Sequence, residues 1–223
     1  MMRTIATILI STPLLVMIAA HTRAENWPQF RGPNGDGHAS SKQLPLAWSE
    51  KENITWKTAI HDKGYSSPVI WGNQIWMTTG TADGIKLYAI CVDRESGKII
   101  HDLHLFDVEK PEHCAPTNSY ASPTPVIEAG RVYAHFGTNG TACIDTASGK
   151  VLWTRRDLKC EHEQAAGSSP MLFGDLFVVH VDGRDVQYVI ALDKLTGKTV
   201  WKTDRSIDFS RYEAYQRKGY CMP

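Results

Sequence analysis

The chain has 223 residues, and its 24 lysines and arginines balance its 24 aspartates and glutamates, so the formal net charge at pH 7 is zero. This balance gives no support to nucleic-acid binding, which usually needs a clustered basic face. No block of like charge and no long low-complexity stretch marks a tail or a linker, and the length is sufficient to bury a sizeable core.

Residues 1–24 are expected to be a cleaved export signal. Arg3 supplies a positive start, Ile5 to Ala20 is almost wholly apolar, and Thr22-Arg23-Ala24 puts small residues at the two positions that a signal peptidase reads. The apolar run is short for a membrane span, and a retained N-terminal anchor is the alternative. We therefore expect an exported protein located in the periplasm or the cell envelope.

Residues 25–52 are expected to form a turn-rich N-terminal arm. Its stretch NWPQFRGPNGDG (Asn26 to Gly37) is rich in Gly, Pro and Asn, with Trp27 and Phe30 as candidate anchors, and it lacks the alternating acidic ligands of a Ca²⁺ loop. The next stretch, NITWKTAI (Asn53 to Ile60), predicts a lone strand. We interpret it as an outermost strand that completes the last blade of a ring.

A repeated pattern dominates the rest of the chain. CVDRESGKIIH, CIDTASGKVLW and ALDKLTGKTVW begin at Cys91, Cys143 and Ala191, and they share (A/C)-x-D-x-x-(T/S)-G-K-x-x-W except for one His in place of Trp. A second marker, GYSSP, SYASP and then AGSSP, precedes each copy and ends at Pro68, Pro123 and Pro170. A fixed period of this size is typical of a propeller or a solenoid.

Each repeat resolves into four short runs of β-branched and aromatic residues separated by Gly, Asp and Asn turns. The prediction is an all-β fold, a β-propeller of four-stranded antiparallel blades. The predicted blades are 66–105, 121–158 and 167–205, inside a repeat domain of residues 53–223.

The repeated motif also has a mechanical interpretation. The aspartate can accept backbone N–H bonds at the turn, and the glycine can take the positive φ that closes the hairpin loop. The tryptophan then lies on the outermost strand, where its ring can pack against the next blade. The residues assigned to this docking motif are Asp145, Gly149, Trp153, Asp193, Gly197 and Trp201.

Three blades are fewer than the four to eight of a closed ring, so we expect an open arc of a larger propeller. The last five residues, GYCMP (Gly219 to Pro223), match GYSSP, as if a fourth blade began there. Open sheet edges invite pairing with another chain. The 223-residue chain is therefore expected to be a fragment that oligomerises or precipitates when expressed alone.

The chain has five cysteines. Cys91 and Cys143 hold a repeat position that favours a small buried residue, so they are expected to be structural thiols. Cys114, Cys160 and Cys221 fall between repeats, where a disulfide or a free thiol is possible, and the connectivity cannot be deduced.

The repeated motif resembles the tryptophan-docking repeat of the pyrroloquinoline-quinone (PQQ) propellers, a superfamily that includes BamB-like outer-membrane assembly proteins. The resemblance covers about Asn53 to Pro223, and the Asn26 to Gly37 stretch resembles the opening of exported PQQ-repeat-like proteins common in planctomycetes. The resemblance does not by itself imply PQQ binding. The quinoprotein dehydrogenases of this superfamily usually carry an adjacent Cys-Cys pair, acidic and amide Ca²⁺ ligands and an aspartate base, whereas this chain has no Cys-Cys dipeptide and no CxxCH haem motif.

Candidate ligand-binding residues lie just before the blade-opening strands, where propeller loops surround the central channel. They are His113, Asn118, Tyr120, Glu161 and His162. Zn²⁺ binding by the His113-Cys114 and Cys160–Glu163 groups is one alternative, a Cys114–Cys160 disulfide is another, and plain polar loops are the third. His104, His135 and His180 are expected to be hydrogen-bonded sheet histidines.

The sequence therefore favours an exported, non-catalytic propeller that serves as a binding scaffold for an unknown protein, peptide or small ligand. Envelope association is possible, and no catalytic, cofactor-binding or metal residue is assigned. The alternatives are a fragment of a PQQ- and Ca²⁺-dependent alcohol or sugar dehydrogenase and a purely structural surface module.

Overall fold

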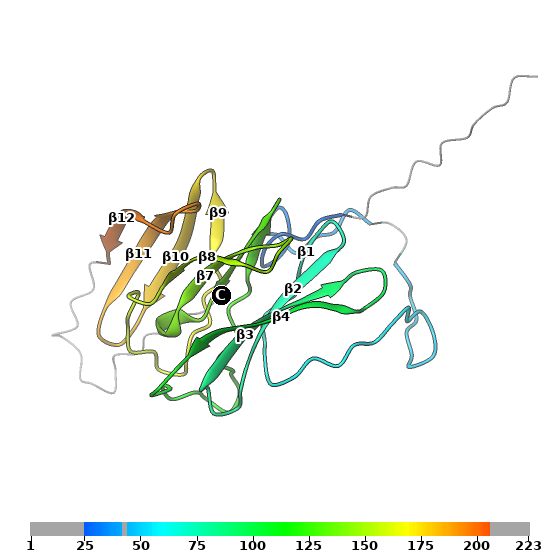
Figure 1. Ribbon diagram of the computed structural model, residues 1–223, viewed down its shortest axis with the longest axis horizontal. Helices are drawn as coiled ribbons and strands as arrows, with labels where there is room; N and C mark the ends of the chain where they lie inside the picture. The colour runs from blue at the N-terminus through cyan, green and yellow to red at the C-terminus, as the bar shows by residue number, and fades with distance from the viewer. Residues whose placement is uncertain (1–24, 42–43, 206–223) are drawn as a thin grey trace, which may run out of the picture.

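The structure is a computed structural model that describes residues 25–41 and 44–205. Its strands form three four-stranded antiparallel sheets (Figure 1). The first sheet contains β1 (Val69–Trp71), β2 (Gln74–Gly80), β3 (Lys86–Asp93) and β4 (Ile99–Asp107). The second contains β5 (Val126–Glu128), β6 (Arg131–His135), β7 (Thr141–Asp145) and β8 (Val151–Arg155). The third contains β9 (Met171–Phe173), β10 (Leu176–Asp182), β11 (Gln187–Asp193) and β12 (Thr199–Asp204).

The all-β prediction with four-stranded blades is thus confirmed for the described residues. A single 3₁₀ turn, η1 (Gly137–Asn139), interrupts the second sheet between β6 and β7. The export signal, Cys221 and the final GYCMP stretch lie outside the described residues. Among residues 25–41 and 44–205, no helix is both long enough and apolar enough to cross a bilayer.

The repeated turn between the third and fourth strands has the same geometry in each sheet. In the third sheet, Asp193 Oδ1 accepts hydrogen bonds from the Thr196 backbone N–H at 2.8 Å and from the Thr196 hydroxyl at 2.7 Å. The Gly197 N–H donates to the Asp193 carbonyl, and Gly197 has φ of 70°. The hydroxyl bond, followed by the backbone bond, lowers the pKa of Asp193.

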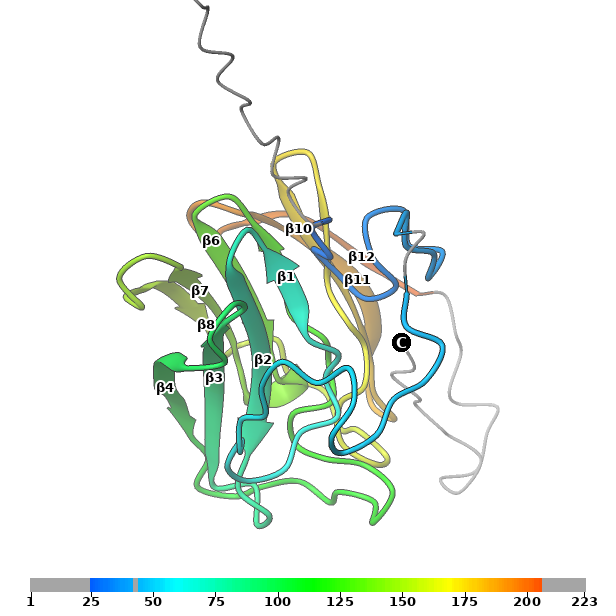
Figure 2. The same cartoon turned by 90° about the vertical axis from the view of Figure 1, so that its right-hand side faces the viewer.

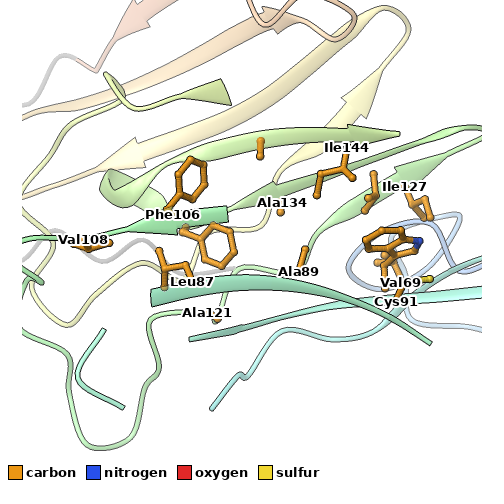
Figure 3. Close-up of a cluster of buried hydrophobic side chains, with 14 residues drawn as sticks. Val69, Leu87, Ala89, Cys91, Phe106, Val108, Ala121, Ile127, Ala134 and Ile144 are labelled. Carbon is orange, nitrogen blue, oxygen red and sulfur yellow. The ribbon is translucent and has the colours of Figure 1, made fainter. Parts of the chain in front are cut away.

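Two apolar layers hold the three sheets side by side, with the second sheet in the middle (Figure 1). Between the first and second sheets, Leu87 and Ala89 belong to one cluster with Ala134 and Ile144 (Figure 3). Trp76 and Phe136 belong to the same cluster. The second layer joins the second and third sheets and contains Tyr133, Phe177, Ile190 and Leu192. Strand alternation explains both layers, because the middle sheet sends alternate residues to the sheets on its two sides.

An aromatic ring packs against the turn glycine of each sheet. A Cβ atom placed on Gly197 would lie 2.7 Å from the Trp153 ring, and Trp153 Nε1 donates to the Lys194 carbonyl at 3.0 Å. Trp56 is placed in the same way over Gly97 of the first sheet. His101 lies in the same way against Gly149, the turn glycine of the second sheet.

The lone strand predicted at Asn53 to Ile60 is wrong. These residues make no β-ladder, because no strand among the described residues lies beside them to accept their backbone hydrogen bonds. Trp56 nevertheless makes the docking contact that its motif suggested, with Nε1 donating to the Arg94 carbonyl at 2.9 Å. The Thr58 hydroxyl donates to the Gly97 carbonyl, which fixes the same segment.

The N-terminal arm covers the free edge of β1. Trp27 and Ile70 exchange backbone hydrogen bonds of 2.9 and 2.8 Å, and Asn26 Oδ1 accepts from the Gly72 N–H. The Trp27 ring also lies against Gly32. Figure 2 shows the arm in blue, on the side of the molecule opposite the outer strands β4 and β8.

Candidate functional site

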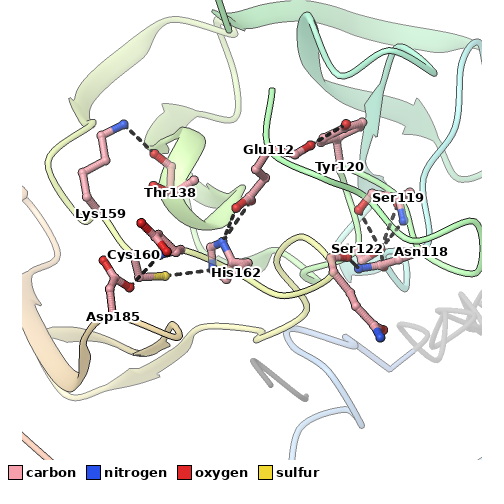
Figure 4. Close-up of polar contacts among 12 residues, drawn as sticks. Glu112, Asn118, Ser119, Tyr120, Ser122, Thr138, Lys159, Cys160, His162 and Asp185 are labelled. Carbon is pink, nitrogen blue, oxygen red and sulfur yellow. Dashed lines mark hydrogen bonds and ion pairs between the residues drawn. The ribbon is translucent and has the colours of Figure 1, made fainter. Parts of the chain in front are cut away.

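Two loops meet on the face that was predicted to border the channel. One loop, residues 108–125, leads from β4 to β5, and the other, residues 156–170, leads from β8 to β9. Glu112 connects them: its carbonyl accepts a 2.8 Å bond from the Tyr120 hydroxyl, and its carboxylate lies 2.9 and 3.0 Å from His162 Nδ1 (Figure 4). Tyr120 and His162, predicted as neighbours, are thus joined through a residue that was not predicted.

The His162 ring occupies a tightly built position. It lies so close to Gly137 that a Cβ at that glycine would be 2.7 Å from its Cε1, and 2.4 Å from the Ala166 methyl group. On its other nitrogen, His162 Nε2 is 3.2 Å from Cys160 Sγ. His162 and Cys160 are both buried, so this part of the site is a packed interior.

Asn118 joins the same two loops at a second point. Its Nδ2 donates to the Gln164 carbonyl at 2.7 Å, while its Oδ1 accepts from the Ser122 hydroxyl at 2.5 Å. Ser119 Oγ is 2.8 Å from Ser122 Oγ. The amide therefore organises a small hydroxyl cluster at the opening of the second sheet.

Two cavities flank this cluster. The first has a volume of about 160 Å³, and Lys63, Cys114, Asn118 and Tyr120 contribute to its lining. The second, which we call the serine cavity, has a volume of about 220 Å³. It is lined by Phe30, Tyr65, Ser67, Asn118, Ser122, Thr124, Gly167 and Ser169.

The serine cavity is a direct product of the repeat. Ser67, Ser122 and Ser169 are the residues before the proline in the three blade-opening markers, and they reach one cavity because the three sheets radiate from it. The Ser67 N–H donates to Thr124 Oγ1, and the Thr124 N–H donates to Ser169 Oγ, both at 3.0 Å. The signal for this cavity was present in the sequence, as the marker's shared serine.

The remaining predicted site residues lie apart from these contacts. His113 is exposed, and the Glu161 side chain is exposed and faces Arg184 at 3.9 Å. Asn118, Tyr120 and His162 thus take part in the hydrogen bonds within and between the two loops, whereas the side chains of His113 and Glu161 lie apart from these bonds. Glu112 was missed because its bond to His162 spans fifty positions of sequence, a contact that only the folded chain creates.

The cysteine alternatives are partly decided by the structure. Cys114 carries a free thiol, so the proposed Cys114–Cys160 disulfide is not formed. Its Sγ lies 3.6 Å from the Ala115 carbonyl, and burial raises the pKa of the thiol. Within the described ranges, no three His, Cys, Asp or Glu side chains are grouped as metal ligands.

The three sheet histidines are placed as predicted. His135 Nδ1 is 2.8 Å from Thr141 Oγ1, His180 Nε2 is 2.7 Å from Ser168 Oγ, and His104 Nε2 is 3.2 Å from the Phe106 carbonyl. Burial, followed by the neighbouring His162 and His180, lowers the pKa of His135 to about 3. His135 is therefore a neutral hydrogen-bonding group of the sheet.

Comparisons with solved structures identify the fold. The chain superposes on a quinohemoprotein alcohol dehydrogenase from Comamonas testosteroni with a TM-score of 0.57 and 17% identity, covering 83% of this chain and 28% of that one. A quinohemoprotein alcohol dehydrogenase from Pseudomonas putida HK5 gives 0.55 and 18%, covering 80% and 26%. BamB from Moraxella catarrhalis gives 0.47 and 19%, covering 67% and 39%. This chain thus spans well under half the length of each of these structures.

The sequence comparisons match part of the chain to a family model. A search of curated proteins gave no significant match. The family model described as outer membrane protein assembly factor BamB matches residues 110–206, which contain the second and third sheets. Residues 110–206 are thus similar to that family, and the likeness to the solved structures shows a shared β-propeller fold.

Proposed function

We propose that this chain is an exported, non-catalytic propeller module that binds a protein segment or small ligand at its inner loops. The description of the matched family as an outer membrane assembly factor supports a protein partner and a place in the periplasm or envelope. The sequence of residues 1–24 supports export.

The lining of the serine cavity is the observation that carries the proposal. It offers hydroxyls from three repeats, the Asn118 amide and the rings of Phe30 and Tyr65, and none of the described residues that line it carries a carboxylate, amine or imidazole group. Hydroxyl and amide groups pair with peptide N–H and C=O groups, and aromatic rings pack against apolar side chains. Such a surface suits an uncharged, extended peptide or a neutral polar ligand.

Two ionisable groups near the serine cavity form hydrogen bonds within the protein. Tyr120 and Glu112 hold loops together through the bonds described above, and burial raises the pKa of Tyr120, so it stays a neutral donor. Neither group is among the residues that line the serine cavity. Here they stabilise the loops that shape it.

Likeness to the alcohol dehydrogenases makes a PQQ enzyme the second candidate. Their cofactor is implied by the fold family, so its fit can be tested on the serine cavity. Ca²⁺ takes six to eight oxygen ligands and favours carboxylates, whereas the described lining of the serine cavity contains no carboxylate. The residues do not fit PQQ with Ca²⁺, and we derive no step through that group.

Binding of a panel of fluorescent, uncharged peptides, followed by anisotropy, tests the proposal. Tyr65→Ala should weaken binding at least about fivefold, because the 53% exposed Tyr65 side chain lines the serine cavity. Phe173→Ala is the matched control, since Phe173 is an exposed ring on the third sheet, outside the cavity lining. Equal affinities for the two variants would contradict the placement.

The enzyme alternative has its own assay. The purified chain should retain no PQQ through gel filtration after incubation with PQQ and Ca²⁺, and it should reduce no electron-acceptor dye with alcohols or sugars. Stoichiometric retention of PQQ would overturn the scaffold proposal in favour of the dehydrogenase.

A further inference from the structure

A thiol, an imidazole and a carboxylate form a continuous hydrogen-bonded chain in the interior of the inner loops. Cys160 Sγ is 3.2 Å from His162 Nε2, and His162 Nδ1 is 2.9 Å from one Glu112 oxygen and 3.0 Å from the other (Figure 4). We call this set the Cys160–His162–Glu112 cluster. The proposed binding function makes no use of it.

The direction of each hydrogen bond follows from its end groups. An ionised carboxylate can only accept, so His162 Nδ1 carries the proton that is donated to Glu112. This leaves Nε2 with its lone pair facing Cys160 Sγ, where it accepts the thiol proton. A nucleophile, a base and a group that orients the base are the three parts of an activated thiol.

The surroundings fix the cluster in this arrangement. Gly137 and Ala166 confine the His162 ring, and the Glu112 carbonyl is held by the Tyr120 hydroxyl. The side chains of His162 and Glu112 are 3% and 16% exposed. Low solvent content strengthens the attraction between an imidazolium and a thiolate.

The described titratable groups beside the cluster include His135, Tyr188, Asp185 and Lys159. His135 stays neutral because its pKa is lowered to about 3. Burial, and then Cys160, raise the pKa of Tyr188 to about 12, so Tyr188 is neutral as well. Asp185 accepts from the Glu161 N–H beside Cys160 and opposes a thiolate there. Lys159 donates to the Thr138 carbonyl and supplies the nearest amine in the sequence.

We propose that Cys160 is an activated thiol that reacts with small hydroperoxides. His162 Nε2 takes the proton of the thiol, and the sulfur attacks one peroxide oxygen while the O–O bond breaks. The sulfur is oxidised to a sulfenic acid, the peroxide is reduced, and the proton on His162 leaves with the departing oxygen as water or alcohol.

The size of the substrate follows from burial. Cys160 is 6% exposed and His162 is 5% exposed, so a peptide chain cannot reach the sulfur as a protease substrate would. A molecule of two oxygen atoms can enter through small motions of the loops. A cavity of about 420 Å³ borders the Glu112 end of the cluster and brings solvent close to it.

Peroxide oxidation with site-resolved trapping tests the proposal on the full chain. The chain is treated with hydrogen peroxide and dimedone at pH 6, 7 and 8, and the adduct at each cysteine is followed by peptide mass spectrometry. Cys160 should be trapped at pH 6 within about threefold of its rate at pH 8. The rate at Cys114 should fall by about 50-fold or more, because an ordinary thiol has a pKa of about 8.5 and burial raises that of Cys114.

Two variants separate activation from simple exposure. Glu112→Gln keeps an acceptor for Nδ1 but removes the charge, and it should slow Cys160 trapping several-fold at pH 6. His162→Asn removes the base and should slow trapping at least tenfold at pH 6, with the pH profile of an ordinary thiol. Should His162→Asn fail to fold, the wild-type profile and Glu112→Gln still decide.

The overturning results are equally definite. The proposal fails if Cys160 and Cys114 lose reactivity in parallel between pH 8 and pH 6. It also fails if Cys160 is trapped only after unfolding in urea, or if Glu112→Gln leaves its rate unchanged. Because the readout is thiol chemistry, none of these results bears on peptide binding at the serine cavity.

Discussion

Single glycines decide how closely the sheets of this molecule approach one another. Gly197 has φ of 70° and lies under the Trp153 ring. A side chain at this position would therefore strain the backbone and also clash with the ring. The turn residues of the sequence motif predicted the positive φ of this glycine. The ring contact could not be predicted from the motif of one repeat, because the ring that covers the glycine comes from 44 residues earlier in the chain.

Gly197→Ala should therefore lower the free energy of unfolding by roughly 2–4 kcal/mol, through a left-handed backbone penalty and displacement of the Trp153 ring. Gly174→Ala isolates the backbone part, since Gly174 has φ of 57° but no atom within 4 Å of the position that a Cβ would occupy; it should cost only about 1 kcal/mol. Urea denaturation measures both. Equal losses would show that the ring contact contributes nothing.

Gln74 compensates for the histidine that replaces tryptophan in the first repeat. In the other docking contacts an indole N–H reaches the carbonyl after the turn aspartate. At the second sheet this carbonyl belongs to Thr146, and Gln74 Nε2 donates to it at 2.8 Å while Gln74 Oε1 accepts from Trp76 Nε1 at 3.1 Å. No local sequence pattern indicates that a glutamine amide takes the place of the indole N–H at this carbonyl.

Gln74→Ala should cost about 2 kcal/mol or more, since it leaves the buried Trp76 N–H and the Thr146 carbonyl without these partners. The neighbouring Asn73→Ala is the control, because Asn73 is exposed and its bond is to Asp93 at the surface. Thermal melts of both variants check the prediction. A Gln74→Ala variant as stable as Asn73→Ala would contradict it.

The buried His135 should make the fold sensitive to acid. Its folded pKa of about 3 lies below the ordinary 6.5, so below pH 6.5 the unfolded chain binds a proton that the folded chain does not. Stability is therefore lost as the pH falls from 6.5 towards 3, by up to about 1.4 kcal/mol per pH unit. His61 acts in the opposite sense, since the hydrogen bonds that its ring donates to Asp102 and then Asp62 raise its pKa.

The slope of stability against pH isolates the residue responsible. His135→Asn keeps a polar group near Thr141 and should flatten the loss between pH 6.5 and 4, whatever its effect at neutral pH. His61→Asn should instead steepen that loss. Parallel curves for wild type and His135→Asn would show that His135 does not govern acid unfolding.

Among the elements, the strands were predictable and the lone N-terminal segment was not. The runs from Met171 to Asp204 alternate and are separated by turn residues, and the structure makes them β9 to β12. Asn53 to Ile60 carries a similar local pattern but has no strand partner in the described chain. A strand exists only through its neighbour. The serine cavity was not predicted, although the serine shared by the three markers is visible in the sequence. The Glu112 contact with His162 could not be found from either loop alone.

The outer-strand tryptophans should differ in their contribution to stability. Trp153 lies half-buried between Tyr133 and Phe177, with ring centroids 6.0 and 6.2 Å away, so Trp153→Ala should cost roughly 3 kcal/mol. Trp201 is 40% exposed. Because the ring is not buried, Trp201→Ala should cost below about 1 kcal/mol. Denaturant midpoints of the two variants test the difference.

Across the whole molecule, equivalent rows of residues have unequal environments. In the second sheet the row Val126, Tyr133, Cys143 and Trp153 faces the third sheet, and its first three members are at most 2% exposed. The equivalent row of the third sheet is Met171, Val178, Ala191 and Trp201. Met171 is 48% exposed, and Phe173 on the same face is 72% exposed. Among the described residues, no fourth sheet covers this face.

An exposed apolar sheet face with the shape of a blade interface should drive association between copies of this chain. Sedimentation velocity from about 1 to 50 μM should show a rising weight-average mass, and Phe173→Lys together with Trp201→Lys should shift the chain towards monomer, because each lysine would have to be buried in the contact. Tyr65→Lys, at an exposed ring outside the third sheet, should leave association unchanged. A wild-type chain that sediments as one monomeric species across the range would contradict this prediction, because it would show that the exposed face of the third sheet does not drive association.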